Sequence, residues 1–114
     1  MLPKAYRMSK KSDFEKVFTY GKSYSSRYVV IYIFKGLPLK FGFIASKKIG
    51  NAVKRNRAKR LMREALRLNL YRLKKEYQMI FIARSFINNA SLQDVEKSII
   101  NIWKKAGVLS EDNI

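Results

Sequence analysis

The chain has 114 residues, the length of one ordinary domain, and 47% of them are hydrophobic, which is enough to form a core. It contains no cysteine and no histidine. Disulfide bonds, thiolate zinc sites, cysteine nucleophiles and a histidine general base are therefore excluded. We expect a single domain over residues 1–114, with flexible tails at about residues 1–10 and 108–114.

The charge balance is extreme, because 25 Lys and Arg face 8 Asp and Glu and give a net charge of +17. Such a field repels itself and favours an acidic partner. Nucleic acid is the first candidate, an anionic membrane is the second, and a merely solvated basic surface is the third. No stretch approaches the ~20 apolar residues of a membrane span, and no long apolar run follows the basic N-terminus, so the sequence favours a cytoplasmic protein.

The first predicted element is a short helix. Ser12 and Glu15 have the spacing of a capping box at its start. Phe14, Val17 and Phe18 repeat at helical spacing, and a glycine at position 21 ends the helix.

Two strands follow. Residues 27–34 are rich in Tyr, Val and Ile and predict a strand that is apolar on both faces. We therefore expect both faces to be covered, or one of them to be a contact surface. A turn at residues 36–38 leads to a second predicted strand over residues 40–45.

The second half of the chain predicts a helix, a strand and a helix. A basic loop at residues 46–51 precedes a long helix over residues 52–70, with Asn51 as its cap. Residues 77–83 predict the third strand. The last helix begins after Ser91, with Asp94 in its first turn, and ends at Gly107.

The element order is therefore helix, strand, strand, helix, strand, helix. This order predicts an α+β fold, an α/β sandwich in which helices pack on a small, mostly antiparallel sheet.

The strongest signal lies between residues 47 and 63, where no acidic residue interrupts a run of cations: Lys47, Lys48, Lys54, Arg55, Arg57, Lys59, Arg60 and Arg63. At about 100° per residue, Asn56, Arg60, Arg63 and Arg67 share one stripe of the predicted helix, opposite an apolar stripe of Ala58, Leu61, Met62, Ala65 and Leu66. Cations are unfavourable near a helix N-terminus, where the dipole is positive. The pattern therefore indicates a functional surface for anions.

Residues 45–64, ASKKIGNAVKRNRAKRLMRE, resemble the signature of the protein subunit of bacterial ribonuclease P, with the Arg55-Asn56-Arg57 tripeptide at its centre. The similarity covers most of the chain. Residues 13–18 with the following Gly21 resemble the first helix of that family, residues 82–84 the end of its last strand, and residues 104–107 its C-terminal close.

The resemblance implies a ribosomal protein S5 domain 2-like fold with a left-handed βαβ crossover. It also implies that catalysis belongs to a separate RNA subunit that binds Mg²⁺, so the protein itself holds no catalytic residue. The holoenzyme would be an endoribonuclease that removes the 5′ leader of precursor tRNA. The implied partners are ribonuclease P RNA and precursor tRNA, with no membrane and no protein partner required.

Two RNA-binding regions follow from the resemblance. The basic segment would contact the catalytic RNA through Lys47, Lys48, Lys54, Arg55, Asn56, Arg57, Lys59, Arg60 and Arg63. A cleft between the first helix and the sheet would hold the single-stranded leader through Phe14, Phe18 and Tyr32, with Tyr28 and Phe34 on the same strand face. From composition alone, core packing is the better interpretation of Phe14 and Phe18, and Trp103 is assigned to the core.

Three other classes of protein fit parts of the sequence. A ribosomal or general RNA-binding chaperone fits the charge and fold class but not the long basic signature. A peripheral membrane protein would need the apolar face of the long helix, which the sheet already requires. A self-sufficient nuclease would need clustered carboxylates for metal ions, and the acidic residues are scattered.

Overall fold

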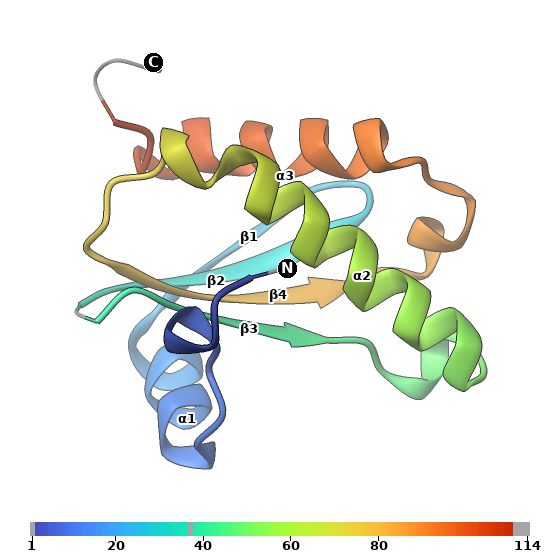
Figure 1. Ribbon diagram of the computed structural model, residues 1–114, viewed down its shortest axis with the longest axis horizontal. Helices are drawn as coiled ribbons and strands as arrows, with labels where there is room; N and C mark the ends of the chain where they lie inside the picture. The colour runs from blue at the N-terminus through green and yellow to red at the C-terminus, as the bar shows by residue number, and fades with distance from the viewer. Residues whose placement is uncertain (1, 37, 111–114) are drawn as a thin grey trace.

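The computed structural model describes residues 2–36 and 38–110 (Figure 1). Its helices and strands are α1 (Lys11–Tyr20), β1 (Lys22–Ser25), β2 (Val29–Lys35), β3 (Lys40–Ile44), α2 (Ala52–Asn69), β4 (Tyr77–Ala83) and α3 (Leu92–Ala106). Short 3-10 turns complete the chain: η1 (Lys4–Tyr6), η2 (Lys47–Ile49), η3 (Leu70–Arg72) and η4 (Ser85–Asn89).

One four-stranded sheet, in the order β1-β2-β4-β3, organises the fold. The β1–β2 and β2–β4 pairs are antiparallel, whereas β3 and β4 run parallel and are joined through α2. Figure 1 shows α2 and α3 on one face of the sheet and α1 on the other. The expected α+β sandwich with a mostly antiparallel sheet is confirmed.

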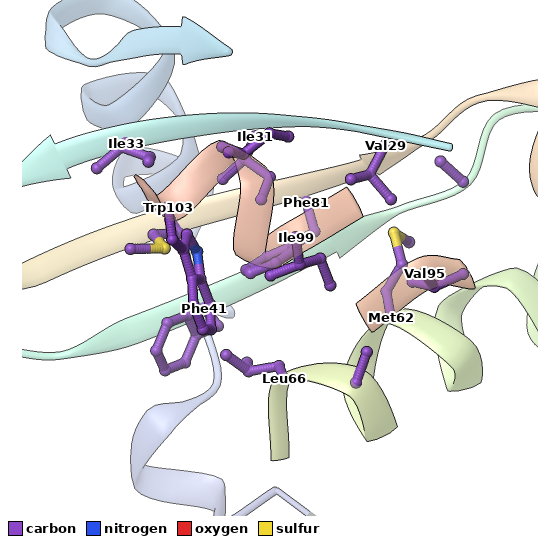
Figure 2. Close-up of a cluster of buried hydrophobic side chains, with 14 of the residues drawn as sticks. Val29, Ile31, Ile33, Phe41, Met62, Leu66, Phe81, Val95, Ile99 and Trp103 are labelled. Atoms are coloured by element: carbon purple, nitrogen blue, oxygen red, sulfur yellow. The ribbon is translucent and has the colours of Figure 1, made fainter. Parts of the chain in front are cut away.

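The main core lies between the sheet and the pair α2 and α3 (Figure 2). Alternate residues of β2, namely Val29, Ile31 and Ile33, are buried on this side. The predicted apolar stripe of α2 packs there, because Met62 and Leu66 are fully buried. Trp103 of α3 is also fully buried, which confirms its assignment to the core.

The N-termini of the helices follow the predicted caps in two of three cases. The Asn51 side chain accepts a hydrogen bond from the backbone N–H of Lys54 at 3.0 Å. Ser91 and Asp94 form a reciprocal capping box. The predicted box of Ser12 and Glu15 is wrong, because α1 already begins at Lys11 and Ser12 lies inside it.

The strand β1 was not predicted. Its four residues alternate two polar serines with Lys22 and Tyr24, which gives no apolar period. Pairing with β2 creates the strand, with Lys22 opposite Ile33 and Ser25 opposite Val30. The predicted turn at residues 36–38 includes Leu37, which lies outside the described residues.

Flexible tails at about residues 1–10 and 108–114 remain an expectation, but the described residues at both ends of the chain pack on the domain. Leu2 and Met8 are buried, and the Met8 N–H donates to the Phe41 carbonyl at 2.8 Å. Val108 and Leu109 are buried as well. Both ends therefore belong to the packed domain as far as it is described.

Candidate nucleic-acid interface

Positive charge is concentrated at the start of α2. Gly50, shortly before the helix, has a φ of 134°, a backbone conformation that residues other than glycine rarely adopt. The first turn of α2 holds Lys54 and contains no acidic residue. The free N–H groups of a helix start add partial positive charge to these cations. The sequence thus places positive charge where a helix would normally carry Asp or Glu.

Most of the predicted RNA-contacting side chains point to solvent. Arg55 and Lys59 are half-buried, and the others are exposed: Lys47, Lys48, Lys54, Asn56, Arg57, Arg60 and Arg63. The segments that carry these side chains lie at one end of the sheet, because β3 and β4 finish where η2 and α2 begin (Figure 1). The structure therefore brings this predicted group together on one surface.

Two arginines of this surface also donate hydrogen bonds to backbone carbonyls of neighbouring loops. The Arg57 guanidinium donates to the carbonyls of Ile87 at 3.2 Å and Ala90 at 2.8 Å, which fastens η4 to α2. Arg55 donates to the Gly50 carbonyl at 2.8 Å. These side chains have a structural task besides any contact with RNA.

Other cations of α2 differ in how far they are engaged. The Arg63 guanidinium lies 5.6 Å from the centre of the Phe43 ring. Arg67 pairs with Glu64, and this hydrogen bond holds the pKa of the Glu64 carboxyl below its usual value. Within residues 2–36 and 38–110, no ion pair is made by Lys47, Lys48, Lys54 and Arg60. These four side chains are also exposed, whereas Lys59 is half-buried and Arg55, Arg57 and Arg63 contact other groups of the protein, so the four have the most charge to offer to an anion.

The opposite face of the sheet carries α1 and the predicted leader residues. Phe14 is half-buried and packs on Gly42, where an added Cβ would lie 2.5 Å from the phenyl ring. Phe18 meets Tyr32 edge to face, with ring centroids 4.9 Å apart, and remains 39% exposed. Phe18 and Tyr32 are therefore available at the surface, whereas Phe14 mainly fixes α1 on the sheet.

Beside α1, one row of apolar side chains on the sheet is only half-buried. Val30, Ile82 and Ile44 lie side by side in this row through the pairing of β2, β4 and β3. We call it the open row. It lies at the end of the sheet where α2 begins, so it connects the Phe18–Tyr32 pair with the basic surface.

The assignment of Tyr28 needs correction. It precedes β2 and packs against the main core instead of sharing the face of Tyr32. Phe34 does lie on the α1 side, in the same cluster as Tyr32. Alternation along a strand cannot be extended beyond the residue where the strand begins.

The sequence analysis missed an exposed phenylalanine with two arginines beside it, at the end of the sheet where α2 begins. Phe86 is 51% exposed, and the guanidinium groups of Arg27 and Arg84 lie 5.5 Å and 5.9 Å from its ring centre. Arg84 and Phe86 are close in sequence, but Arg27 precedes β2, so no local motif shows that all three lie together. The resemblance to the family includes Arg84 only as part of the end of the last strand.

The described residues contain no group of three or more Asp or Glu side chains that could hold a metal ion. Among them there is also no helix with the length and apolar character needed to cross a membrane.

Comparisons with known proteins agree with this arrangement. The family model described as Ribonuclease P matches residues 2–107. A relative in Clostridioides difficile named "Ribonuclease P protein component" is 42% identical, covering 89% of this chain and 91% of its own. One of the same name in Clostridium botulinum strain Langeland is 44% identical, covering 92% of this chain and 97% of its own.

Solved structures show the same likeness in three dimensions. A ribonuclease P protein from Staphylococcus aureus superposes with a TM-score of 0.79 at 32% identity, covering 96% of each chain. One from Thermotoga maritima gives a TM-score of 0.77 at 27% identity, covering 87% of this chain and 96% of the other. With the family model spanning nearly the whole domain, the chain belongs to the ribonuclease P protein family.

Proposed function

We propose that this chain binds the catalytic RNA of ribonuclease P and the 5′ leader of precursor tRNA, and so assists the endonucleolytic removal of that leader. The observation that carries the proposal is that two different surfaces meet at one end of the molecule. The unpaired cations near the start of α2 and the open row of the sheet meet at the same end of the molecule. In this proposal one RNA lies on the basic surface and the other on the open row.

The two surfaces suit different forms of RNA. Lysines and arginines without acidic partners attract the phosphate backbone of a folded RNA. Aromatic and aliphatic side chains such as Phe18 and Tyr32 suit unpaired bases, which can stack on them. The basic surface therefore takes the catalytic RNA, and the α1 side takes the single-stranded leader.

In this proposal the chemistry belongs to the RNA subunit. Mg²⁺ ions bound mainly by that RNA supply the metal-assisted hydrolysis. The chain contributes position and charge and does not touch the reacting bond with a catalytic side chain. The holoenzyme acts in the cytoplasm and needs no further protein.

The test is cleavage of a precursor tRNA by ribonuclease P RNA at low Mg²⁺, with and without this protein. We expect the protein to restore cleavage at the mature 5′ end and to be inert alone. A variant that changes Lys47, Lys54 and Arg60 to Ala should lose the effect. A control that changes Lys97, Lys104 and Lys105 removes equal charge from exposed positions of α3 and should retain it. Equal loss in both variants would show that only net charge matters.

A further inference from the structure

A separate hollow lies at the other end of the sheet, between the end of α1, the start of β1 and the end of α3. Figure 1 shows these three chain segments on its left side. The volume of the hollow is 320 Å³. The aromatic and basic side chains around it are Tyr20, Lys22, Tyr24, Phe34, Lys35 and Tyr77. It is thus away from the start of α2 and shares no residue with the basic surface.

The chemistry of this hollow favours one class of ligand. Tyr20 is 73% exposed, so its ring is free to stack on a planar group. Lys22 makes no ion pair within the described part of the chain, whereas Lys35 lies 3.9 Å from Glu76 in an exposed pair. A stacking ring beside a cation matches an unpaired base and its phosphate. The volume is at the lower end of the range of about 300–1,000 Å³ for small-ligand sites.

The hollow also continues the surface of the Phe18–Tyr32 pair. Along β2, Val30, Tyr32 and Phe34 alternate onto the α1 side of the sheet, so the line from the open row through Tyr32 leads to Phe34. The Phe34 side chain belongs both to the cluster under α1 and to the wall of the hollow, and the Lys16 ammonium lies 5.4 Å from its ring centre. A strand of RNA leaving Tyr32 would reach the hollow after a short step.

A second basic hollow at the opposite edge of the sheet is less suitable. Its wall contains Lys4, Arg7 and Lys40 but no aromatic side chain. Arg7 donates to the Leu2 carbonyl at 3.0 Å, and Lys40 pairs with Asp13 at 3.5 Å. Its charge is therefore largely engaged within the protein.

We propose that the hollow at Tyr20 and Lys22 binds one unpaired nucleotide of the precursor leader, farther from the cleavage site than the nucleotide on Phe18 and Tyr32. The inference rests on the proposed function, because it takes the leader to run from the start of α2 along the open row. Tyr20 stacks on the base, and Lys22 contacts a neighbouring phosphate.

The experiment measures the affinity of the assembled holoenzyme for precursor tRNAs whose leaders lengthen one nucleotide at a time. The wild-type protein should bind more tightly when the leader becomes long enough to reach the hollow. The variants Tyr20→Ala and Lys22→Ala should lose this increase, by about tenfold for Tyr20→Ala given the usual strength of base stacking. Short leaders should bind as before.

Matched controls separate this effect from general ones. Tyr71→Ala removes another exposed tyrosine and Lys97→Ala another exposed lysine, and both should keep the wild-type increase. A 2-aminopurine base at the distal leader position should show quenched fluorescence with wild-type protein and recover it with Tyr20→Ala. Thermal unfolding of each variant checks that the fold is intact.

Two results would overturn the inference. If Tyr20→Ala and Lys22→Ala bind every leader like the wild type, the hollow holds no nucleotide. If they weaken binding equally with and without a leader, the hollow touches the catalytic RNA instead. A wild-type protein that responds to leader length through Phe18 alone would leave the proposed function standing, whereas no response to any leader would contradict both.

Discussion

Arg57, one of the side chains that we propose to contact RNA, also stabilises the fold. Its guanidinium spans two carbonyls of the segment that follows β4, at 3.2 Å and 2.8 Å, while the residue remains exposed. A planar group with several donors can make both contacts at once, and a lysine ammonium cannot reproduce that geometry. Arg60, one turn along the same helix, makes no ion pair in the described part of the chain. These two arginines should therefore respond differently to the same substitution.

We predict that Arg57→Lys lowers the free energy of unfolding by about 1 kcal/mol, roughly the net value of one hydrogen bond. Arg60→Lys should leave it unchanged within a few tenths of a kcal/mol, as for most exposed sites. Urea unfolding followed by circular dichroism compares the two variants with the wild type. Equal stability of both variants would mean that the contacts of Arg57 with η4 contribute nothing to the fold.

At the Phe18–Tyr32 pair we predict an effect on binding and not on folding. Phe18→Ala should weaken holoenzyme affinity for a leader-bearing precursor by about tenfold, because base stacking on an aromatic ring is worth roughly 1–3 kcal/mol. Affinity for mature tRNA should not change. Binding titrations with both RNAs and with Tyr71→Ala as control make the comparison. An equal loss for both RNAs would remove Phe18 from the leader site.

At the scale of elements, prediction worked where the signal is local. Asn51, Ser91 and Gly107 lie at helix ends, and hydrogen bonds within a few residues explain each of them. The strand β1 failed because its polar sequence gains a partner only when β2 lies beside it. Ser12 failed because a capping motif does not fix the first residue of a helix to within one position.

The candidate site likewise contains features that local sequence predicts and features that depend on contacts between distant segments. The basic surface could be read from consecutive residues, because a single loop and helix carry it. The contacts of Arg57 with Ile87 and Ala90, 30 and 33 residues away, could not be predicted from spacing. The open row and the hollow at Tyr20 likewise depend on which strands become neighbours. Local chemistry was therefore predictable, and the shape of the surface was not.

The capping box of α3 predicts a pH dependence. A hydrogen bond from the Ser91 backbone N–H, followed by one with its side chain, lowers the pKa of Asp94 from its usual value. A carboxyl with a lowered pKa in the folded state stabilises it above the unfolded pKa of about 3.9 and loses this contribution as the pH falls through the folded pKa.

We therefore predict that the wild type is more stable than Asp94→Asn at neutral pH, and that this difference shrinks as the pH falls below about 4. Unfolding free energies of both proteins across that range provide the measurement. Taking the difference removes titrations that the two proteins share, such as that of Glu64. A difference that stays constant into acid would show that ionised Asp94 does not support the cap.

For the whole molecule, charge is the dominant property. The chain carries a net charge of +17, and the described residues contain only four ion pairs. Most of the cations are thus uncompensated within the fold, and an RNA partner would displace its own counterions to meet them. Affinity for RNA should fall steeply as salt rises, and each cation that contacts a phosphate should contribute to the slope.

The salt dependence of RNA affinity distinguishes cations that contact RNA from cations that already form an ion pair within the protein. Arg60→Ala should make the slope of log affinity against log salt shallower by about 0.7–1 for the loss of one phosphate contact. Arg67→Ala removes the same charge from the same helix, but Arg67 already pairs with Glu64, so the slope should stay nearly unchanged. Titrations of ribonuclease P RNA at several salt concentrations measure both slopes. If the two variants change the slope equally, the RNA responds to total charge, and the pattern of free cations on α2 has no role in binding.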